Sequence, residues 1–386
     1  MKRAVDAVVI GAGISGAAAA LELAEAGLSV VLLDRWGPAA MASGWTLAGV
    51  RQSGRHPAEL PLARAAVRMW EELSERLGVD VRYRQEGNLR LARTPEEVPV
   101  IERLVAEQAA AGLDVTLLRG ADVQAVAPAV SSAVLAACHC PSDGHADPVV
   151  AVNGFVDAGV RAGVETRFGE RVLEIETASG GVVAVRTDKG RIACGRVVLC
   201  AGVFGNELLE PLGARVPLEV MLVAAMRSAP LPPILRQVIG VANADCAGRQ
   251  QADGCFRATS GVQAFTGQIR DGVRPSVLPP AAALADIVRI FGAAVPAFAV
   301  AEVEAIWAGL LDMTPDALPV LDRVPGAEGL VLAMGFSGHG FCLGPVTGQI
   351  LAAMAQDQDI AFDMAPFRLA RFEGWNAAPE AVSLHG

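Results

Sequence analysis

Residues 7–34 read AVVIGAGISGAAAALELAEAGLSVVLLD, and this stretch decides the fold class. The apolar runs at 7–10 and 28–33 predict two buried strands of a parallel sheet. The alanine-rich segment between them predicts a helix to about residue 26, which Gly27 is placed to end. A strand, a helix and a strand within fewer than 35 residues form one β-α-β unit. This unit predicts an α/β protein that begins with a Rossmann-like domain.

Three glycines join the first strand to the helix in the pattern Gly-x-Gly-x-x-Gly. Gly11 allows the tight turn, Gly13 lets the backbone approach a pyrophosphate, and Gly16 lets helix and strand pack closely. The helix N-terminus would present N–H groups to the phosphates. Asp34, 18 residues after Gly16, can accept hydrogen bonds from both ribose hydroxyls and would repel a 2′-phosphate. The pattern predicts a bound dinucleotide; the alternative is a glycine turn in an α/β domain that binds no nucleotide. The predicted contacts from this unit are Gly11, Gly13, Ile14, Ser15, Gly16, Asp34 and Arg35.

The bulk composition sets limits on domains and partners. The chain has 386 residues, of which 52% are apolar and 19% charged. This length predicts two domains in one subunit, and the apolar fraction supplies a large core. The net charge is −10, from 32 basic and 42 acidic residues. An acidic chain repels phosphate polymers, so nucleic acid is not an expected partner.

Targeting and metal-binding signals are weak in this sequence. Met1-Lys2-Arg3 imitates a secretory signal, but Asp6 and the glycine turn interrupt the apolar stretch. No run of 18 residues is apolar enough to predict a transmembrane helix. Seven cysteines, an odd number without Cys-x-x-Cys, favour a reducing compartment, so a cytoplasmic protein is expected. Cys138-His139-Cys140 lacks a second ligand pair at zinc-like spacing, so no metal site is expected.

The remaining elements are predicted from periodicity and from helix-start signals. Thr94-Pro95-Glu96-Glu97 has the form of a helix N-cap with proline at the first position. Residues 215–300 are read as a mixture of short strands and loops. Helices are predicted at 61–77, 94–111, 148–163 and 345–356, and strands at 172–176, 182–187, 191–193 and 197–200.

The segment after the first β-α-β unit bears on the choice between NAD and FAD. An NAD enzyme usually continues with regular β-α units, whereas residues 36–55 are irregular and rich in Gly, Ser and Ala. The sequence resembles the D-amino-acid oxidase and sarcosine oxidase family of FAD enzymes over nearly its whole length. Three blocks carry the resemblance: 42–51, the strand end Leu-Cys-Ala-Gly at 199–202, and Gly-Phe-Ser-Gly-His-Gly-Phe at 335–341.

The resemblance implies further FAD contacts outside the first unit. It implies that residues 43–51 run along the flavin, that Val172 lies by the adenine, and that the glycines of 335–341 let a helix N-terminus meet the flavin ring. The contacts implied in this way are Ser43, Gly49, Val50, Arg51, Val172, Ala201, Gly202, Gly309, Leu310, Gly338, His339, Gly340, Phe341 and Cys342.

The sequence departs from the family at the residues that bind a substrate carboxylate. In glycine-oxidase-like members an arginine follows Trp-x-Gly-Leu, where this chain has Leu311. In monomeric sarcosine oxidases a lysine follows Gly-His-Gly-Phe, where this chain has Cys342. Arg51 or Arg55 is therefore predicted to bind the carboxylate, because guanidinium suits bidentate carboxylate binding. Each could instead pair within its own loop, and His339 could shape its loop rather than act beside the flavin.

Two further features bear on cofactor attachment and on partners. No cysteine lies near Gly309, where the resemblance implies a covalent tether, so FAD is expected to be non-covalent. The segments 307–316 and 50–57 resemble β subunits of heteromeric dehydrogenases that act on sarcosine, proline, hydroxyproline or opines. The resemblance implies partner subunits that carry FMN or an iron–sulfur cluster. His145, in Gly-His-Ala-Asp-Pro, is expected to have a capping or loop role rather than to touch a second flavin.

The predicted reaction is oxidation of the C–N bond of a small amino acid or secondary amine, with hydride transfer to flavin N5. One alternative is a stand-alone glycine or D-amino-acid oxidase that uses O2; another is a non-catalytic flavin-binding subunit. The expected architecture is a discontinuous FAD-binding domain and a substrate domain with a mainly antiparallel sheet. The FAD-binding segments are 1–80, 147–212 and 305–386, and the substrate-domain segments are 81–146 and 213–304.

Overall fold

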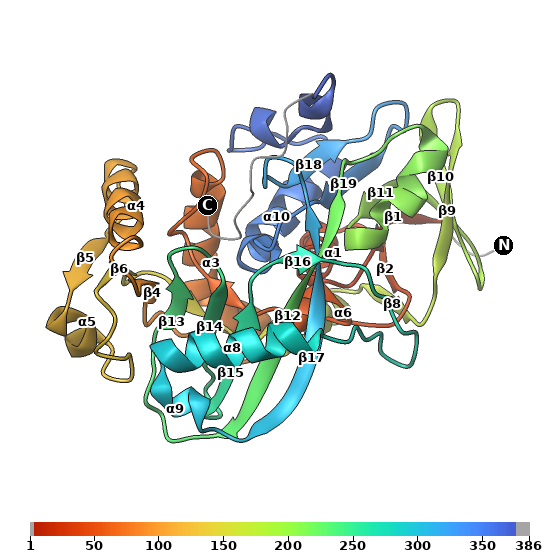
Figure 1. The fold of residues 1–386 in the computed structure, drawn as a ribbon. Coiled ribbons are helices and arrows are strands. Elements are labelled where there is room, and N and C mark those ends of the chain that lie inside the picture. The colour runs from red at the N-terminus through yellow and green to blue at the C-terminus, as the bar shows by residue number, and fades with distance from the viewer. Residues whose placement is uncertain (1–3, 376–386) are drawn as a thin grey trace.

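The computed structural model describes residues 4–375, so the Met1-Lys2-Arg3 start and the end of the segment 305–386 lie outside the described residues. Two large sheets organise the chain, as Figure 1 shows. One contains eight strands and the other nine. Each sheet is built from segments far apart in the sequence, so the chain passes repeatedly from one sheet to the other.

The eight-stranded sheet begins with the β-α-β unit. Strand β1 (Val5–Ile10) lies at its centre, parallel to β2 (Val30–Asp34) and to β11 (Gly190–Leu199). All three end at the same edge of the sheet. The sheet is completed by β8 (Glu165–Phe168), β9 (Val172–Ala178), β10 (Gly181–Thr187), β18 (Val320–Arg323) and β19 (Leu330–Met334).

Helix α1 (Ile14–Glu25) is packed tightly against α10 (Gly340–Ala355). Small residues permit the close approach: a Cβ added at Gly344 would lie 2.5 Å from Ile14 Cγ1, and one at Gly348 would lie 2.5 Å from Ala18 Cβ. Helices α3 (Leu60–Leu77) and α6 (Pro148–Arg161) contact α10 and α1, respectively. This layer buries one face of the Rossmann-like sheet and fixes the N-terminus of α1.

The nine-stranded sheet is antiparallel except where β4 (Asn88–Ala92) and β13 (Val238–Val241) pair in parallel. Its longest strands, β12 (Glu219–Pro230) and β17 (Val303–Met313), pair along nearly their whole lengths. Its other strands are β5 (Thr116–Arg119), β6 (Ala136–Cys140), β14 (Cys246–Gln250), β15 (Cys255–Ser260) and β16 (Gln263–Ala264). An α/β fold that joins a Rossmann-like sheet to a mainly antiparallel one confirms the predicted fold class.

Further helices cover the antiparallel sheet. Helix α8 (Ala281–Ala294) packs on β12, β14 and β15, and α4 (Val98–Ala110) packs on β4 and β6. The remaining described helices are α2 (Ala42–Trp45), α4 (Val98–Ala110), α5 (Ala121–Val126), α7 (Gly205–Leu209), α8 (Ala281–Ala294) and α9 (Pro296–Ala299), with 3-10 turns at Gly202–Phe204, Glu210–Leu212, Ala365–Phe367 and Leu369–Phe372. Strands β3 (Gly49–Val50) and β7 (Gly144–His145) form a small separate sheet.

Several predicted boundaries were wrong for identifiable reasons. The helix expected at Thr94 begins at Val98, because the N–H of Glu97 bonds to the Thr94 carbonyl and makes a turn of the intervening residues. The last helix begins at Gly340 rather than at Pro345, which lies inside α10. The strands predicted at 191–193 and 197–200 are one strand, β11, which pairs first with β10 and then with β1.

The largest error is helix α8, which lies in the region read as strands and loops. Its buried residues Ala283, Ile287, Ile290 and Phe291 follow helical spacing, but the preceding prolines and the alanine-rich start hid the pattern. The 12-residue strand β12 was also missed in that region, because it lies between two partner strands distant in sequence.

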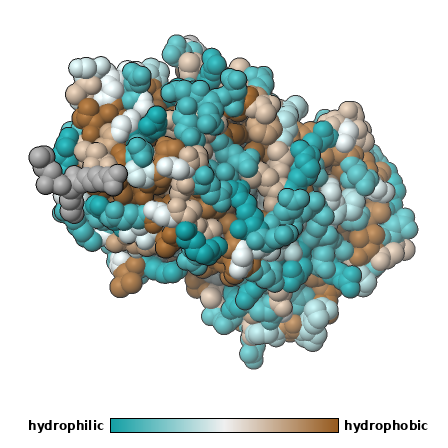
Figure 2. Space-filling model, turned by 180° about the vertical axis from the view of Figure 1, so that it is seen from behind, coloured by the Kyte–Doolittle hydropathy of each residue, from teal (hydrophilic) through white to brown (hydrophobic). Residues whose placement is uncertain are grey.

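The surface carries both apolar and polar side chains. On the face shown in Figure 2, apolar side chains lie interspersed with hydrophilic ones. Among the described helices, none is both long and apolar enough to cross a membrane.

Candidate active site

Two adjoining cavities lie between the carboxyl edge of the Rossmann-like sheet and a face of the antiparallel sheet. The larger encloses about 1580 Å³ of empty space and the smaller about 990 Å³, each partly open to solvent. They share part of their walls, including Gly13, Ser43, Cys200 and Asp312. A long ligand can therefore extend from one cavity into the other.

The smaller cavity opens at the carboxyl ends of β1, β2 and β11, the edge at which open α/β sheets bind nucleotides. Asp34 lies in its wall. One carboxylate oxygen of Asp34 accepts from the N–H of Ala12 at 2.9 Å, and the other accepts from the N–H groups of Trp36 and Gly37 at 2.8 Å. Burial raises the pKa of Asp34, and these backbone hydrogen bonds oppose the rise.

The glycine turn fits the approach of a pyrophosphate. A Cβ added at Gly11, where φ is +104°, would lie 2.3 Å from the Cys200 carbonyl oxygen. A Cβ at Gly16 would lie 1.9 Å from the Gly11 carbonyl oxygen. Gly13 faces both cavities, and a Cβ there would meet only Ser43 Oγ, at 3.1 Å. Helix α1 starts here, and Gly13, Ile14, Ser15 and Gly16 all line the larger cavity, so the helix N-terminus faces it.

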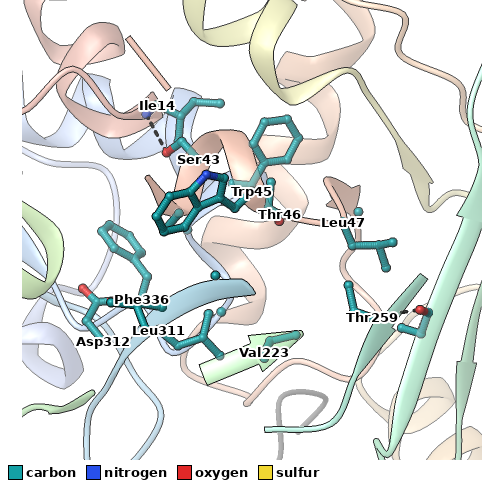
Figure 3. Close-up of a pocket in the computed structure, with 18 of the residues that line it drawn as sticks. Ile14, Ser43, Trp45, Thr46, Leu47, Val223, Thr259, Leu311, Asp312 and Phe336 are labelled. Carbon is teal, nitrogen blue, oxygen red and sulfur yellow. Dashed lines mark hydrogen bonds between the residues drawn. The ribbon is translucent and has the colours of Figure 1, made fainter. Parts of the chain in front are cut away.

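The larger cavity has a mainly apolar wall supplied by the antiparallel sheet and by residues 42–49. In Figure 3, Trp45 and Leu47 lie across the space from Leu311 and Val223. The N–H of Ile14 donates to Ser43 Oγ at 3.0 Å, which ties this loop to the start of α1. An apolar wall of this kind suits a flavin ring and the hydrocarbon part of a substrate.

A buried group of charges lies at one side of the larger cavity. Arg51 and Arg55 line the cavity, and the Arg55 guanidinium lies 3.2 Å from Glu59. The other Glu59 oxygen lies 3.0 Å from His339 Nδ1. Burial raises the pKa of Glu59, but His339 and Arg55 more than offset it and hold the pKa at about 2. Glu59 is therefore a buried carboxylate anion that joins the loop of Arg51 to the start of α10.

A second buried carboxylate, Asp143, supports the same loop. Its oxygens accept from the N–H groups of Gln52 and Ser53 and from the Ser53 hydroxyl. The Arg51 guanidinium donates to the Ser53 and Gly54 carbonyls. Burial, and then the charges of Arg55 and Arg90, lower the pKa of Arg51 well below its usual value. The loop is thus fixed by charged groups from three separate segments.

Most residues predicted to contact FAD or substrate line one or both cavities. Three do not: Val50, His339 and Cys342 lie behind the wall, and the Cys342 thiol lies 3.4 Å from the Arg51 carbonyl oxygen. The predicted residues in the walls are Gly11, Gly13, Ile14, Ser15, Gly16, Asp34, Arg35, Ser43, Gly49, Arg51, Arg55, Val172, Ala201, Gly202, Gly309, Leu310, Gly338, Gly340 and Phe341.

Sequence reasoning missed Glu59 and Arg90. Glu59 follows Arg55 by four residues just before α3, a spacing that allows an ion pair. Arg90 stands between Leu89 and Leu91 on β4. The alternation of polar and apolar side chains along that strand was the available signal that Arg90 lies on the face opposite the two leucines.

His145 lies outside both cavity walls, on strand β7. Its Nδ1 lies 2.9 Å from an Arg249 guanidinium nitrogen, while burial, Arg249 and Arg84 lower its pKa well below the usual value. Asp147, not His145, caps α6 by accepting from the N–H groups of Val149 and Val150.

The cysteines and acidic residues form no metal centre among residues 4–375: no group of three or more His, Cys, Asp or Glu side chains there could hold a metal ion. All seven cysteines are unpaired thiols. Burial raises the pKa of Cys138 to about 11 and that of Cys200 to about 12.

Comparison with known proteins identifies the family. Residues 6–354 match the family described as "FAD dependent oxidoreductase" (DAO), and the chain belongs to this family. This confirms the resemblance seen in the sequence, and with it FAD as the cofactor and oxidoreductase as the enzyme class.

Relatives of several kinds share the whole fold. The chain is 28% identical to "Glycine oxidase" from Geobacillus kaustophilus (strain HTA426) over 382 residues, which cover 96% of this chain and 97% of that one. It is 27% identical to "Sarcosine oxidase subunit beta" from Arthrobacter sp over 388 residues, covering 96% and 92%. The solved structure of L-proline dehydrogenase from P. horikoshii superposes with a TM-score of 0.88 at 24% identity, covering 97% and 99%. At that identity the likeness shows the fold alone.

Proposed function

We propose that this chain oxidises the C–N bond of a small secondary or D-amino acid, of the proline, hydroxyproline, sarcosine or opine type. When bound, FAD supplies the acceptor for the hydride that leaves the substrate carbon. The observation that carries the proposal is the combination of an apolar cavity wall with buried guanidinium groups at one side. An amino acid presents matching chemistry: a hydrocarbon part and a carboxylate that must be paired when it is buried.

Of the two arginines predicted from the sequence, Arg51 is the better candidate for the carboxylate. The charge of Arg55 is already balanced by Glu59 at 3.2 Å. Arg51 lines the larger cavity and donates to the carbonyl oxygens of Ser53 and Gly54; burial, Arg55 and Arg90 lower its pKa, and the carboxylates Asp143 and Glu59 oppose that shift. A substrate carboxylate next to Arg51 would favour its charged form further. Arg55 then acts mainly through Glu59, which holds the loop in place.

The same walls support non-covalent FAD. The N-terminus of α1 and Asp34 would hold the pyrophosphate and the ribose, while Ser43, Gly338, Gly340 and Phe341 would lie along the ring. No cysteine is near Gly309 in the sequence. Acid precipitation should therefore release all the yellow colour into the supernatant; flavin that stays in the protein pellet would contradict this attachment.

The proposed biological unit is a heteromeric dehydrogenase with this chain as its β subunit, and with FMN or an iron–sulfur cluster in a partner. The relative named "Sarcosine oxidase subunit beta" supports this assignment. The relatives named "Glycine oxidase" support the alternative of a stand-alone oxidase that uses O2. A flavin-binding subunit without catalysis of its own is the third possibility, and flavin reduction by amines distinguishes it from the other two.

The proposed domain division follows the two sheets. Strands between residues 88 and 140 and between 219 and 313 build the antiparallel sheet, and the remaining long strands build the Rossmann-like sheet. This supports the substrate-domain segments 81–146 and 213–304, with β17 extending the second of them to residue 313.

The test is anaerobic reduction of the purified holoprotein by D-proline, hydroxyproline, sarcosine and an opine. At least one should bleach the flavin, and Arg51→Met should weaken its binding by about 2–5 kcal/mol. Arg227→Met, a surface arginine paired with Asp253 at 2.9 Å, is the matched control and should behave as wild type. If no amine reduces the flavin, the catalytic proposal fails and the non-catalytic subunit takes its place. Fast turnover of the single chain with O2 would favour the stand-alone oxidase.

A further inference from the structure

Residues 42–49, which we call the cavity loop, form part of the walls of both cavities. The residues of this loop that line the larger cavity are Ala42, Ser43, Trp45, Thr46, Leu47 and Gly49, several of which are labelled in Figure 3. Its first two residues also line the smaller cavity. On the side of the Rossmann-like sheet, the N–H of Ile14 holds the loop through Ser43 Oγ at 3.0 Å. The contacts on its other side come from the antiparallel sheet.

Two side chains of the antiparallel sheet hold the first part of the cavity loop. The Arg257 guanidinium, on β15, donates to the Gly44 carbonyl oxygen at 3.0 Å. The indole N–H of Trp307, on β17, donates to the Trp45 carbonyl oxygen at 3.0 Å. The two donors also pack on each other, because the Arg257 guanidinium carbon lies 4.6 Å from the centroid of the Trp307 ring. Loss of either side chain therefore affects both contacts with the loop.

Arg249 holds the second part of the cavity loop. It lies on β14, directly across from Arg257, and is 1% exposed. Its Nε donates to the Leu47 carbonyl oxygen at 2.5 Å, and one Nη donates to the Ala146 carbonyl oxygen at 2.9 Å. The Ala146 N–H in turn donates to the Ala48 carbonyl oxygen at 3.1 Å. One buried side chain thus holds the loop both directly and through the residue that follows β7.

The contact between Arg249 and His145 supports the end of the same loop. A guanidinium can only donate, so His145 Nδ1 is the acceptor at 2.9 Å and carries no proton while this contact exists. His145 pairs with Gly49, the last residue of the cavity loop, in the small sheet of β3 and β7. Arg249 therefore holds both the loop and the strand that pairs with its end.

The cavity loop contains a backbone conformation that needs such support. Ala48 has a φ of +62°, in the left-handed region that residues other than glycine rarely adopt. It is also fully buried. A strained residue of this kind persists only where its surroundings fix it, and such residues are common at ligand sites. The donors to the carbonyl groups of residues 44, 45, 47 and 48 supply that constraint.

We infer that Arg249, Arg257 and Trp307 are positioning residues that hold the cavity loop in the shape that binds FAD. These three side chains are absent from both cavity walls, so they act through the loop rather than by touching the cofactor. The inference rests on the proposed placement of FAD in the two cavities, but not on which amine is oxidised. It makes the antiparallel sheet a determinant of cofactor affinity as well as a wall of the larger cavity.

The test measures retention of FAD. Holoprotein is diluted to equilibrium, and free FAD is separated by ultrafiltration. Arg249→Met and Arg257→Met should each weaken FAD binding by about ten-fold or more, and Trp307→Phe, which keeps a ring but loses the N–H, by about three-fold or more. Arg227→Met is the matched control, because Arg227 is the cross-strand neighbour of Arg257 but pairs with Asp253 at 2.9 Å. It should keep the wild-type affinity.

Ala48→Gly distinguishes positioning of the loop from a general loss of stability. In the wild-type protein the donors fix residue 48 with or without FAD, so glycine should leave the FAD affinity unchanged. In Arg249→Met the released loop must return to the left-handed conformation when FAD binds, which glycine adopts without steric cost. Ala48→Gly should therefore restore the FAD affinity of Arg249→Met by about three-fold or more. Amide hydrogen exchange in residues 42–49 should also be faster in Arg249→Met holoprotein than in wild type.

Each outcome decides the inference separately from the proposed function. Wild-type FAD affinity in Arg257→Met and Trp307→Phe overturns it, as does a failure of Ala48→Gly to restore affinity in Arg249→Met. If Arg249→Met does not fold, the same rescue must appear in Arg257→Met. Weaker FAD binding in Asp34→Ala with no change in Arg257→Met would keep FAD in the cavities and reject the positioning role alone. Failure of every amine to reduce the wild-type flavin defeats the proposed function instead.

Discussion

The glycine turn and the charged side of the larger cavity are assembled in opposite ways. The turn, its two strands and α1 come from one run of fewer than 35 residues. The charged side draws Arg51, Glu59, Arg90, Asp143 and His339 from segments spread over nearly 300 residues. Local sequence spacing decides the first region, and long-range packing decides the second. A sequence motif is therefore enough to predict the glycine turn, whereas the charged side of the cavity can be predicted only from the complete fold.

The two regions also tolerate change differently. Backbone contacts fix the turn, where a single methyl group has no space. At the charged side, several side chains share each interaction, so that removing one leaves another buried and unpaired. Substitutions in the two regions should therefore differ in how much stability they remove and in which ligand they affect. The largest loss of stability is expected at the turn.

Gly16→Ala should abolish FAD binding and destabilise the protein by about 5 kcal/mol or more, at the upper end of single-residue effects. The new Cβ would lie 1.9 Å from the Gly11 carbonyl oxygen, a backbone atom that cannot move without opening the turn. Thermal unfolding and flavin content measure the effect. Gly195→Ala, on β11 of the same sheet, is the control, because nothing lies within 4 Å of its added Cβ. A yellow, fully folded Gly16→Ala variant would show that the turn is not closed in this way.

Glu59→Ala should destabilise the holoprotein by about 3–5 kcal/mol, because it leaves the Arg55 charge buried without its carboxylate. It should also weaken substrate binding, since the Arg51 loop loses its anchor. Urea unfolding and flavin reduction measure the two effects. Glu304→Ala, which removes an exposed ion-pair partner of Arg227, is the matched control and should cost less than about 1 kcal/mol.

The pH dependence gives Glu59 a second signature. Its pKa is lowered in the folded state to about 2, from an ordinary value of 4.5. Its contribution to stability is therefore complete above pH 4.5 and is lost as the pH falls from 4.5 towards 2. Glu59→Gln should show a flatter stability profile over that interval than wild type. Parallel profiles would mean that Glu59 is not ionised in the folded protein.

The sequence anticipated the fold better than it anticipated the charged side of the cavity. The β-α-β unit follows a strong local pattern, and α3 and α6 start at proline signals close to the predicted positions. Helix α8 was missed because prolines and an alanine-rich start hid its pattern, and the long β12 was missed because its partner strands lie far away in the chain. Arg51 was found through a family resemblance, but Arg90 was not, because only the pairing of β4 with β13 brings it to the same wall.

Asp34→Ala should weaken FAD binding by about 1.5–3 kcal/mol, or roughly 10- to 150-fold, through loss of a charged hydrogen-bond acceptor. The carboxylate already organises the Ala12, Trp36 and Gly37 N–H groups, so part of the loss comes from a less ordered turn. FAD titration of the apoprotein measures it. Asp188→Ala is the control, because Asp188 also accepts a backbone N–H but lies outside both cavity walls. Equal FAD affinity in wild type and Asp34→Ala would place the ribose elsewhere.

The smallest predicted effect separates two helix starts that look alike in the sequence. Both Thr94-Pro95 and Asp147-Pro148 have the form of an N-cap followed by proline, but only Asp147 occupies the cap position in the structure. Its carboxylate accepts from Val149 N–H at 3.1 Å and from Val150 N–H at 3.0 Å. Asp147→Ala should therefore cost about 1 kcal/mol in urea unfolding. The exposed pair that Asp147 makes with Arg82 at 3.2 Å adds at most a few tenths of a kcal/mol.

Thr94→Ala should change stability by less than about 0.5 kcal/mol, because Thr94 precedes a turn and α4 begins only at Val98. Equal losses in the two variants would mean that Thr94 also caps its helix in solution, and that the sequence signal was right where the structure differs from it.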